Sequence, residues 1–226
     1  MFSNFAVFIK KKALVKKGEY VKRMGIIQRK EREKEEMRHL ILEAALRLFR
    51  ERGYDGVSIR NIAEAIEYSP GTIYLYYKDK SEIFFALQYE AAAMKRDYLL
   101  PVASIEDPWE RLIEFGRRYL EFGRKHPDLY DLLFITRAPM EFVENQQCWQ
   151  LGMATHAFFV ETVQACVDRR YFKSTDVDTI AYTLWCHAHG MVSLFVRERM
   201  RMYPEEQRQE LARKSFGMII KMAESL

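Results

Sequence analysis

A short segment at residues 69–76 carries side chains suited to binding nucleic acid. In order, its residues are Ser69, Pro70, Gly71, Thr72, Ile73, Tyr74, Leu75 and Tyr76. Serine is a favourable helix N-cap, and proline is tolerated at the first helical position because the N–H there has no intrahelical partner. The free N–H groups of a helix start attract phosphate, and a glycine lets the backbone approach a ligand closely. The segment therefore predicts a helix whose first turn meets DNA.

Residues 58–69 predict the helix and turn that would hold this segment in place. Ser58 is a suitable N-cap for a helix at 59–66, and Glu67 lies in the turn that follows. A helix-turn-helix needs two short helices that cross steeply, with a small residue where they touch. Ala63 is predicted to be that residue, with Ile66, Ile73 and Tyr77 closing the small core.

The histidines and cysteines offer no comparable arrangement for catalysis. His187 and His189 are two residues apart, so on a helix they point to nearly opposite sides, whereas helical metal pairs need a spacing of four. The remaining candidates are His126, His156 and Cys186, and for each a structural role is favoured. The sequence also contains no P-loop, no G-x-G-x-x-G and no G-x-S-x-G. We therefore predict a protein that is not an enzyme and needs neither cofactor nor metal.

The chain around these residues is predicted to be helical. Proline in a helix interior costs about 3 kcal/mol, and all six prolines fall at plausible helix edges. No stretch alternates apolar and polar residues as a strand would. Helices are predicted at about 28–52, 59–66, 69–77, 79–99, 107–125, from 127, 140–171, 175–202 and from 204 to near the C-terminus. The predicted class is all-α, with an N-terminal three-helix helix-turn-helix domain followed by a larger helical domain for ligand binding and dimerisation.

Charge along the chain suggests three regions. Residues 1–24 hold seven basic residues and one acidic residue, residues 25–82 are neutral, and the whole chain carries +4. Residues 1–25 are expected to form a basic tail that need not be ordered, 26–80 the DNA-binding domain, and 81–226 the sensing and dimerisation domain. Met24 precedes the first strongly helical stretch and is a candidate translation start. No apolar run approaches the roughly 20 residues that span a bilayer, and three widely spaced cysteines suit a reducing cytoplasm.

The stretch "ILEAALRLFRERGYDGVSIRNIAEAIEYSPGTIYLYYKDKSEIFFAL" resembles the DNA-binding domain of the TetR family of bacterial regulators. The pieces A-x-x-L-F-x-x-x-G-Y, S-I-R-N-I-A and T-I-Y-x-Y-Y-x-x-K occur in order and at the spacing of that family. Each piece is weak by itself, but the ordered set is highly specific. The family usually has glycine in the turn, where this chain has Glu67. A left-handed backbone at Glu67 would cost roughly 1 kcal/mol or more.

The resemblance implies a role for particular residues on DNA. Ser58 would bond a phosphate, Arg60 would reach a base edge or phosphate, and Lys80 would pair with the DNA backbone. Thr72 and Tyr74 would contact bases and phosphates. The implied DNA-binding residues are together Ser58, Arg60, Ser69, Pro70, Gly71, Thr72, Tyr74, Leu75, Tyr76 and Lys80.

The second domain is rich in aromatic and sulfur-containing side chains, which favours an apolar ligand pocket. Gly116 and Gly123 are seven apart and share a face of one helix, which leaves room beside its axis. No cluster of arginine or lysine accompanies the candidates, so a largely apolar, neutral or weakly charged effector is expected rather than a nucleotide. The candidate ligand-binding residues are Phe115, Tyr119, Trp149, Met153, Phe158, Phe159, Trp185 and His189.

The spacing W-x-x-x-H-G at residues 185–190 resembles the signature of the WHG type of C-terminal domain. It implies either a pocket role or a packed pair for Trp185 and His189, and both alternatives stay open. Residues 180–196 are apolar nearly all round, so one face could meet a partner subunit. Apolar residues also recur at helical spacing near the C-terminus, which favours an intermolecular four-helix bundle: Ala212, Phe216, Ile219, Ile220 and Ala223.

These patterns predict a homodimeric, cytoplasmic DNA-binding regulator. The resemblance implies a repressor that a small apolar effector releases from a near-palindromic, double-stranded operator. A second hypothesis is a constitutive DNA-binding regulator whose C-terminal domain serves only dimerisation or protein interaction. A cavity between the helices of 108–171 and the 180–196 stretch would favour the sensor, and solid packing would favour the second hypothesis.

Overall fold

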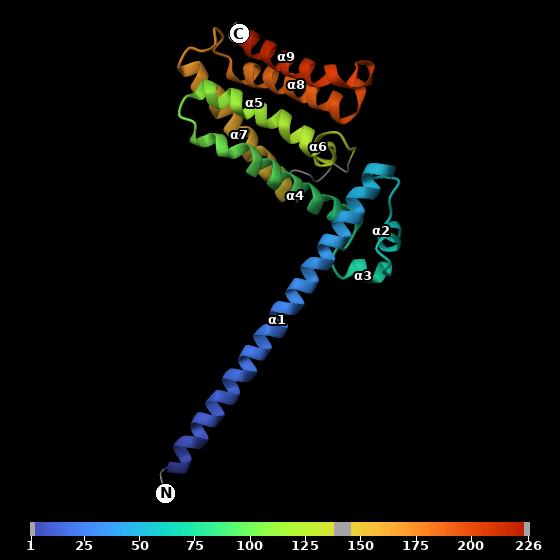
Figure 1. Ribbon diagram of the computed structural model, residues 1–226, viewed down its shortest axis with the longest axis vertical. Helices are drawn as coiled ribbons and strands as arrows, with labels where there is room; N and C mark the ends of the chain where they lie inside the picture. The colour runs from blue at the N-terminus through green and yellow to red at the C-terminus, as the bar shows by residue number, and fades with distance from the viewer. Residues whose placement is uncertain (1–2, 138–145, 224–226) are drawn as a thin grey trace.

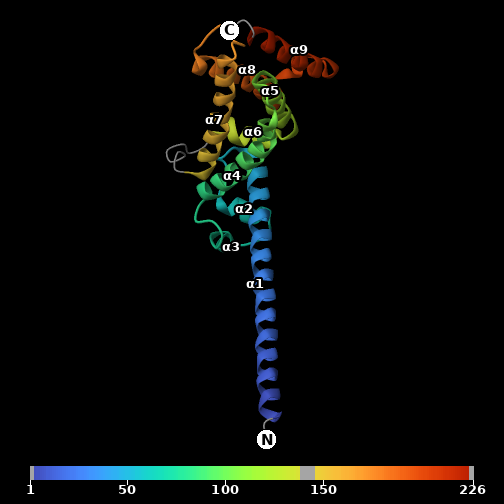
Figure 2. The ribbon, with the colours of Figure 1, turned by 90° about the vertical axis from the view of Figure 1, so that its left-hand side faces the viewer.

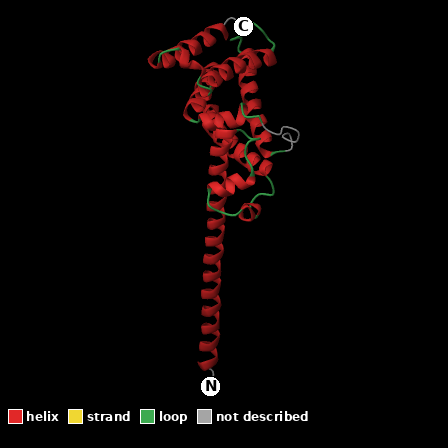
Figure 3. Ribbon diagram, turned by 90° about the vertical axis from the view of Figure 1, so that its right-hand side faces the viewer, coloured by secondary structure: helices red, strands yellow, loops and turns green. Residues whose placement is uncertain are grey.

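The computed structural model describes the backbone of residues 3–137 and 146–223, and the side chains of residues 28–137 and 146–222. Across these residues the chain consists of helices and loops without a strand, which confirms the predicted all-α class (Figure 3). In chain order the helices are α1 (Ser3–Arg52), α2 (Ile59–Ala65), α3 (Pro70–Tyr74), α4 (Lys80–Leu99), a 3₁₀ turn (Leu100–Ser104), α5 (Pro108–Lys125), α6 (Pro127–Phe134), α7 (Gln147–Asp168), α8 (Val177–Val196), a second 3₁₀ turn (Arg199–Met202) and α9 (Glu205–Ala223).

The first helix starts far earlier than the sequence pattern suggested. Its predicted start near residue 28 is wrong, because α1 begins at Ser3 and the expected tail is helical from there. Residues 3–27 contain no proline, and the two glycines, Gly18 and Gly25, each cost a helix only about 1 kcal/mol. The N-terminal half of α1 extends away from the rest of the molecule (Figures 1 and 2). That residues 1–25 are dispensable for folding stays a prediction.

A first hydrophobic core joins α1, α2, α3 and the start of α4. Ala63 of α2 and Ile73 of α3 are fully buried there, and Tyr77 closes the edge. The predicted contact of the two short helices through Ala63 is therefore confirmed. From the second half of the chain, Leu132 of α6 joins this core, and Leu129 and Leu133 pack against it.

A second core lies among α5, α6, α7 and α8. Phe122, Tyr130 and Val163 are fully buried in it, and Leu99 joins it from the end of α4. Because α4 also places Phe84 in the first core, one continuous helix belongs to both. The domain boundary expected at residue 80 coincides with the first residue of this helix.

Two glycines let neighbouring helices approach α5 closely. A Cβ atom at Gly123 would overlap the side chain of Val192 on α8. A Cβ atom at Gly116 would lie 3.0 Å from a ring carbon of Phe216 on α9, tighter than most packed contacts. The room that the sequence predicted beside this helix is thus taken up by α8 at Gly123, whereas Gly116 also lines a cavity.

Several helix ends differ from the predicted ones. α3 stops at Tyr74 rather than Tyr77, although the N–H groups of Tyr76 and Tyr77 still bond the carbonyl of Ile73 as a turn. α7 begins at Gln147 rather than near 140, and residues 138–145 lie outside the described chain. α8 ends at Val196, and a separate 3₁₀ turn covers the remainder of the predicted helix. None of the described helices has the length and apolar character needed to cross a membrane.

Candidate functional site

The start of α2 is fixed by a reciprocal cap. The Ser58 hydroxyl oxygen accepts the Asn61 N–H at 3.2 Å, and the Asn61 side-chain oxygen accepts the Ser58 N–H at 3.0 Å. Ser58 is exposed beside this cap. Arg60 projects from the next turn of α2 and pairs with Glu64 at 3.3 Å, with both side chains largely in solvent. Such an exposed pair contributes little to stability, so the guanidinium is available to another anion.

The start of α3 is capped by Ser69, whose hydroxyl oxygen accepts the Thr72 N–H at 3.2 Å. The side-chain hydroxyl groups of Ser69 and Thr72 also form a hydrogen bond with each other, at 3.1 Å. Pro70 occupies the first helical position, as predicted. Gly71 is exposed, and among the described residues a Cβ atom there would meet only the Ser69 hydroxyl oxygen, at 3.6 Å. No described residue therefore requires glycine at this position.

The turn between α2 and α3 contains a residue in the left-handed region. The backbone angle φ of Glu67 is +60°, and the Tyr68 N–H donates a hydrogen bond to the carbonyl of Ala63 at 3.0 Å. A non-glycine residue pays roughly 1 kcal/mol or more for this conformation. The strain expected from the glutamate at the family's glycine position is present in the structure.

Replacing this residue by glycine, Glu67→Gly, is expected to raise the free energy of unfolding by up to about 1 kcal/mol. Glycine adopts positive φ without steric cost, although its larger unfolded-state entropy offsets part of the gain. Urea unfolding followed by circular dichroism measures the change, and Glu67→Ala, which keeps the Cβ atom, is the control. A gain as large for alanine as for glycine would contradict this account of the turn.

The outward face of α3 presents Tyr74 and Leu75, which are 57% and 79% exposed. Ile73 and Tyr77 point the other way into the core, so the helix is held firmly while its outer face is free. Tyr76 is half-buried against the same core. An exposed aromatic and an exposed leucine on a short, rigidly packed helix suit contact with the edges and methyl groups of bases.

Lys80 has a partner within the protein that the sequence did not predict. Its ammonium donates to the carbonyl of Tyr54 at 2.8 Å and lies 4.1 Å from the centre of the Tyr54 ring. This bond ties the start of α4 to the loop after α1. The ammonium has two further N–H groups, so the predicted phosphate contact stays a prediction.

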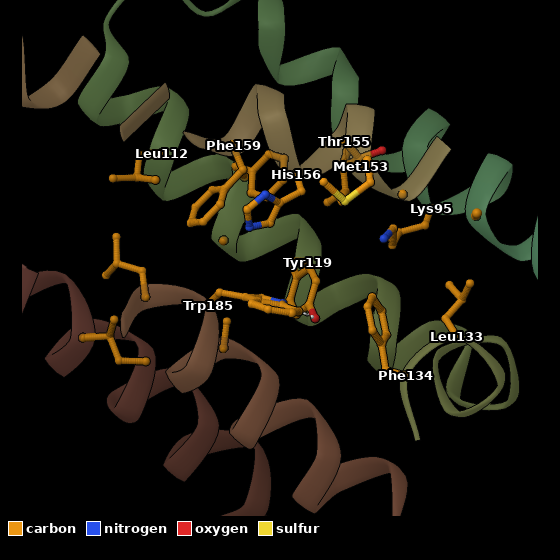
Figure 4. A pocket seen from close by; sticks show the side chains of 18 of the residues that line it. Lys95, Leu112, Tyr119, Leu133, Phe134, Met153, Thr155, His156, Phe159 and Trp185 are labelled. Atoms are coloured by element: carbon orange, nitrogen blue, oxygen red, sulfur yellow. Dashed lines mark hydrogen bonds between the residues drawn. The ribbon is translucent and has the colours of Figure 1, made fainter. Parts of the chain in front are cut away.

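A cavity of about 690 Å³ lies in the second half of the molecule (Figure 4). Its walls come from α4, α5, α6, α7, α8 and α9, with apolar side chains predominating. All three tryptophans of the chain, Trp109, Trp149 and Trp185, line it. The predicted ligand-binding residues that the structure brings to this wall are Phe115, Tyr119, Trp149, Met153, Phe159 and Trp185. A volume of this size falls in the range of about 300–1,000 Å³ that is usual for small-molecule sites.

Two predicted residues are not in the wall. Phe158 packs against Phe115 with ring centres 6.1 Å apart. His189 lies behind the wall, where its Nδ1 is 2.6 Å from the Tyr130 hydroxyl. Burial lowers the pKa of the His189 imidazole, which favours its neutral form. Of the two alternatives for the W-x-x-x-H-G pair, Trp185 therefore has the position of a pocket residue, whereas His189 packs inside the protein.

A chain of hydrogen bonds connects these buried groups. The Trp185 indole donates to the Tyr119 hydroxyl at 3.3 Å, and this hydroxyl lies 2.9 Å from that of Tyr130. Burial raises the pKa of Tyr119 to about 12 and also raises that of Tyr130, so both are neutral donors. In one consistent arrangement, Trp185 donates to Tyr119, Tyr119 donates to Tyr130, and Tyr130 donates to the unprotonated Nδ1 of His189. Helices α5, α6 and α8 are thereby bonded together beside the cavity.

Two charged residues of the wall, Lys95 on α4 and Arg137 after α6, are not among the residues predicted from the sequence. Lys95 is 7% exposed, and its Nζ lies 4.7 Å from the centre of the Phe134 ring. Burial lowers the pKa of this lysine to about 8. The available signal was its position, because Gln88, Ala92 and Lys95 follow the apolar stripe of the helix at spacings of four and three.

Comparison with known proteins matches both halves of the chain. Residues 41–87 match the model of the tetR family of bacterial regulatory proteins, and residues 112–217 match a tetracyclin repressor-like C-terminal domain. The HTH-type transcriptional regulator HbdR of Aromatoleum sp. (strain CIB) is 37% identical over 157 residues, which cover 69% of each protein.

Other similarities are more partial. The HTH-type transcriptional repressor AcnR of Corynebacterium diphtheriae is 33% identical over 100 residues, 44% of this chain and 48% of that protein. The match thus spans about half the length of that repressor. Among solved structures, a bacterial regulatory protein of the tetR family from Rhodococcus RHA1 superposes with a TM-score of 0.67 at 18% identity, covering 82% of this chain and 96% of the other. That likeness concerns the fold.

Proposed function

Since the chain belongs to the TetR family of bacterial regulatory proteins, we propose that it is a DNA-binding transcriptional regulator that represses from a near-palindromic operator until a small, mainly apolar effector releases it. The observation that carries the proposal is the combination, in one chain, of the exposed outer face of α3 and the 690 Å³ cavity. The related proteins named as repressors support the direction of control.

Helix α4 offers a physical connection between the cavity and the DNA-binding surface. Its first half packs Ile83 and Phe84 into the first core, and its second half lines the cavity with Ala92 and Leu99. A rigid helix of 20 residues, about 30 Å long, transmits a shift at one end to the other. A ligand that favours a position of α4 with mis-spaced recognition helices lowers DNA affinity by its differential binding, typically 1–3 kcal/mol.

Helix α6 makes a second connection. Asp128 pairs with Arg50 at the end of α1 at 2.9 Å, and Asp131 pairs with Arg197 at the end of α8, also at 2.9 Å. Directly after Asp131 on the same helix, Leu133 and Phe134 line the cavity. Ligand contact with α6 would therefore reach the first core through Arg50 as well as through Leu132.

The second hypothesis, a constitutive regulator without a small ligand, is less well supported. It required solid packing between α5, α7 and α8, whereas that region surrounds the cavity. The C-terminal half would still serve dimerisation in either case. We place the protein in the cytoplasm with its operator, where the three free cysteines, Cys148, Cys166 and Cys186, would stay reduced.

We propose that the protein is a homodimer through α8 and α9. Tyr182, Leu194 and Phe195 of α8 and Met218 and Met222 of α9 are exposed apolar residues on these two helices. Pairing with a second copy would cover them in a four-helix bundle. Sedimentation at micromolar concentration is expected to give about twice the chain mass of 27.0 kDa. A monomer at that concentration contradicts the arrangement and removes the reason for a palindromic operator.

The proposed function is tested by sequencing the genomic fragments that the purified full-length protein retains. A dimer presents two recognition helices about one DNA turn apart, so the retained fragments should share two inverted half-sites roughly 10 base pairs apart, centre to centre. Retention of fragments without a shared sequence would show that DNA binding is only electrostatic. Release of the isolated operator by added small molecules then separates the effector-controlled regulator from the constitutive one.

A further inference from the structure

The wall of the cavity has positive but no negative side chains among the described residues. Lys95 and Arg137 both line it, and neither an aspartate nor a glutamate does. Lys95 is buried, whereas Arg137 is exposed. Because the surrounding wall is mainly apolar, the field of a buried ammonium is weakly screened inside the cavity. A ligand with a negatively charged group would therefore complement the charge of this wall.

The other polar groups around Lys95 already have partners within the chain. The Gln88 amide donates to the carbonyl of Leu132 at 3.3 Å, and the Thr155 hydroxyl donates to the carbonyl of Leu151 at 3.0 Å. The Tyr119 hydroxyl belongs to the buried chain of hydrogen bonds. Lys95, by contrast, has no hydrogen-bond acceptor or acidic partner among the described residues, and its ammonium lies over the Phe134 ring.

Figure 4 shows where this ammonium points. Its nitrogen is directed into the cavity, between Met153 and Thr155 on one side and Phe134 on the other. Phe159, Trp185 and Leu112 lie further along the cavity, away from Lys95. The cavity therefore offers one buried cation at one end and an apolar and aromatic chamber beyond it.

We propose that the cavity takes a monocarboxylate with an apolar body, whose carboxylate pairs with the Lys95 ammonium. The inference rests on the proposed function, since it names the chemical class of the effector. A buried ammonium without an acceptor is costly, and a bound carboxylate removes that cost while gaining a charge-assisted hydrogen bond. Burial alone already lowers the pKa of Lys95 to about 8, in keeping with an ammonium that lacks a counter-ion.

Because Lys95 is part of α4, a carboxylate bound to it would interact directly with this helix. Lys95 lies on the same helix that packs Phe84 and Leu87 into the first core. Attraction between carboxylate and ammonium acts on α4 itself, and the apolar body meets α7 and α8. An acid would therefore change the position of α4 more effectively than a neutral molecule of equal size.

Matched acids and alcohols test this in the full-length protein by isothermal titration calorimetry at pH 7. The probes are dodecanoate with 1-dodecanol, octanoate with 1-octanol, and 4-phenylbutyrate with 4-phenyl-1-butanol. At least one acid is expected to bind wild type about 10- to 100-fold more tightly than its alcohol, the usual range for a charge-assisted bond. Lys95→Met should remove that preference by weakening the binding of the acid. Lys173→Met, which removes an exposed lysine outside the cavity wall, should keep it.

The outcomes separate this inference from the proposed function. If no acid binds wild type more tightly than its alcohol, or if Lys95→Met keeps the preference, the carboxylate assignment is wrong. Operator release is measured with the same compounds. Acids that bind through Lys95 without releasing the operator support the site and contradict the effector role. Neutral compounds that release the operator, without any preference for acids, support the effector role and overturn the carboxylate.

Discussion

Lys95→Met is expected to raise the free energy of unfolding by roughly 3 kcal/mol at pH 7 in the absence of ligand. The buried ammonium of Lys95 has a pKa of about 8 in the folded protein, below its ordinary value of 10.5. Each unit of difference corresponds to about 1.4 kcal/mol of cost to the folded state. Methionine has a similar length, fits irregular apolar space and carries no charge to desolvate.

The gain should depend on pH in a defined window. Below pH 8 the lysine is charged in both states, so the full cost of burying the charge is present. Between pH 8 and 10.5 the folded state has lost the proton and the unfolded state retains it, so wild-type stability rises relative to the variant. Above pH 10.5 both states are neutral and the difference should vanish.

Urea unfolding of the two proteins from pH 6.5 to 10.5 measures this difference. Other titratable groups of the cavity wall, Tyr119, Arg137, Cys148 and His156, are common to both proteins, so their contributions largely cancel in the comparison. A constant difference across this window would show that Lys95 is not buried as a charge in solution. A lower stability of Lys95→Met at pH 7 would show that the ammonium has a stabilising partner.

Gly71→Ala is expected to weaken operator binding by about 10- to 100-fold without loss of stability. Within the chain, an added Cβ atom meets only the Ser69 hydroxyl oxygen at an ordinary contact distance. Alanine is favoured over glycine in helices, so folding should be unchanged or improved by up to about 1 kcal/mol. On DNA the same methyl group would hold the first turn of α3 away from the groove. Overpacking of this kind typically costs 1–3 kcal/mol.

The measurement is a fluorescence anisotropy titration with the operator obtained from the retained fragments. Gly217→Ala on α9 is the matched control, because no described atom lies within 4 Å of a Cβ atom there, the position is outside the cavity wall, and its helical neighbours Arg213 and Lys221 are exposed. The control should bind the operator as wild type does. Equal affinities for wild type and Gly71→Ala would mean that this end of α3 does not approach DNA closely.

The parts of the fold that depend on local chemistry were predictable from the sequence. Ser58, Ser69, Asp79 and Asp107 each accept a backbone N–H at the start of a helix, and serine and aspartate are favoured there in any fold. The positive φ of Glu67 was likewise expected from the family pattern. The start of α1 was not predictable, since the lysine-rich sequence before residue 28 contains neither a helix stop signal nor an amphipathic stripe.

The missed parts of the candidate site depend on how distant helices lie against one another. Lys95 resembles any solvated lysine until α5 and α7 pack beside α4. Phe216, Ile219 and Ile220 were assigned to dimerisation, although they also line the cavity. His189 was a candidate ligand-binding residue, but its Nδ1 is hydrogen-bonded to Tyr130 of α6. No spacing within one helix predicts such a contact between two helices.

The position of Trp109, Trp149 and Trp185 around one cavity has a spectroscopic consequence. These are the only tryptophans in the sequence, so the indole emission of the whole protein originates from the walls of a single chamber. The Trp185 indole is also hydrogen-bonded to Tyr119, which makes its emission sensitive to rearrangement of the buried hydroxyl groups. A compound that enters the cavity and displaces water there changes the surroundings of the fluorophores directly. The unlabelled chain is therefore its own optical probe of occupancy, and binding can be followed without DNA, dye or enzyme.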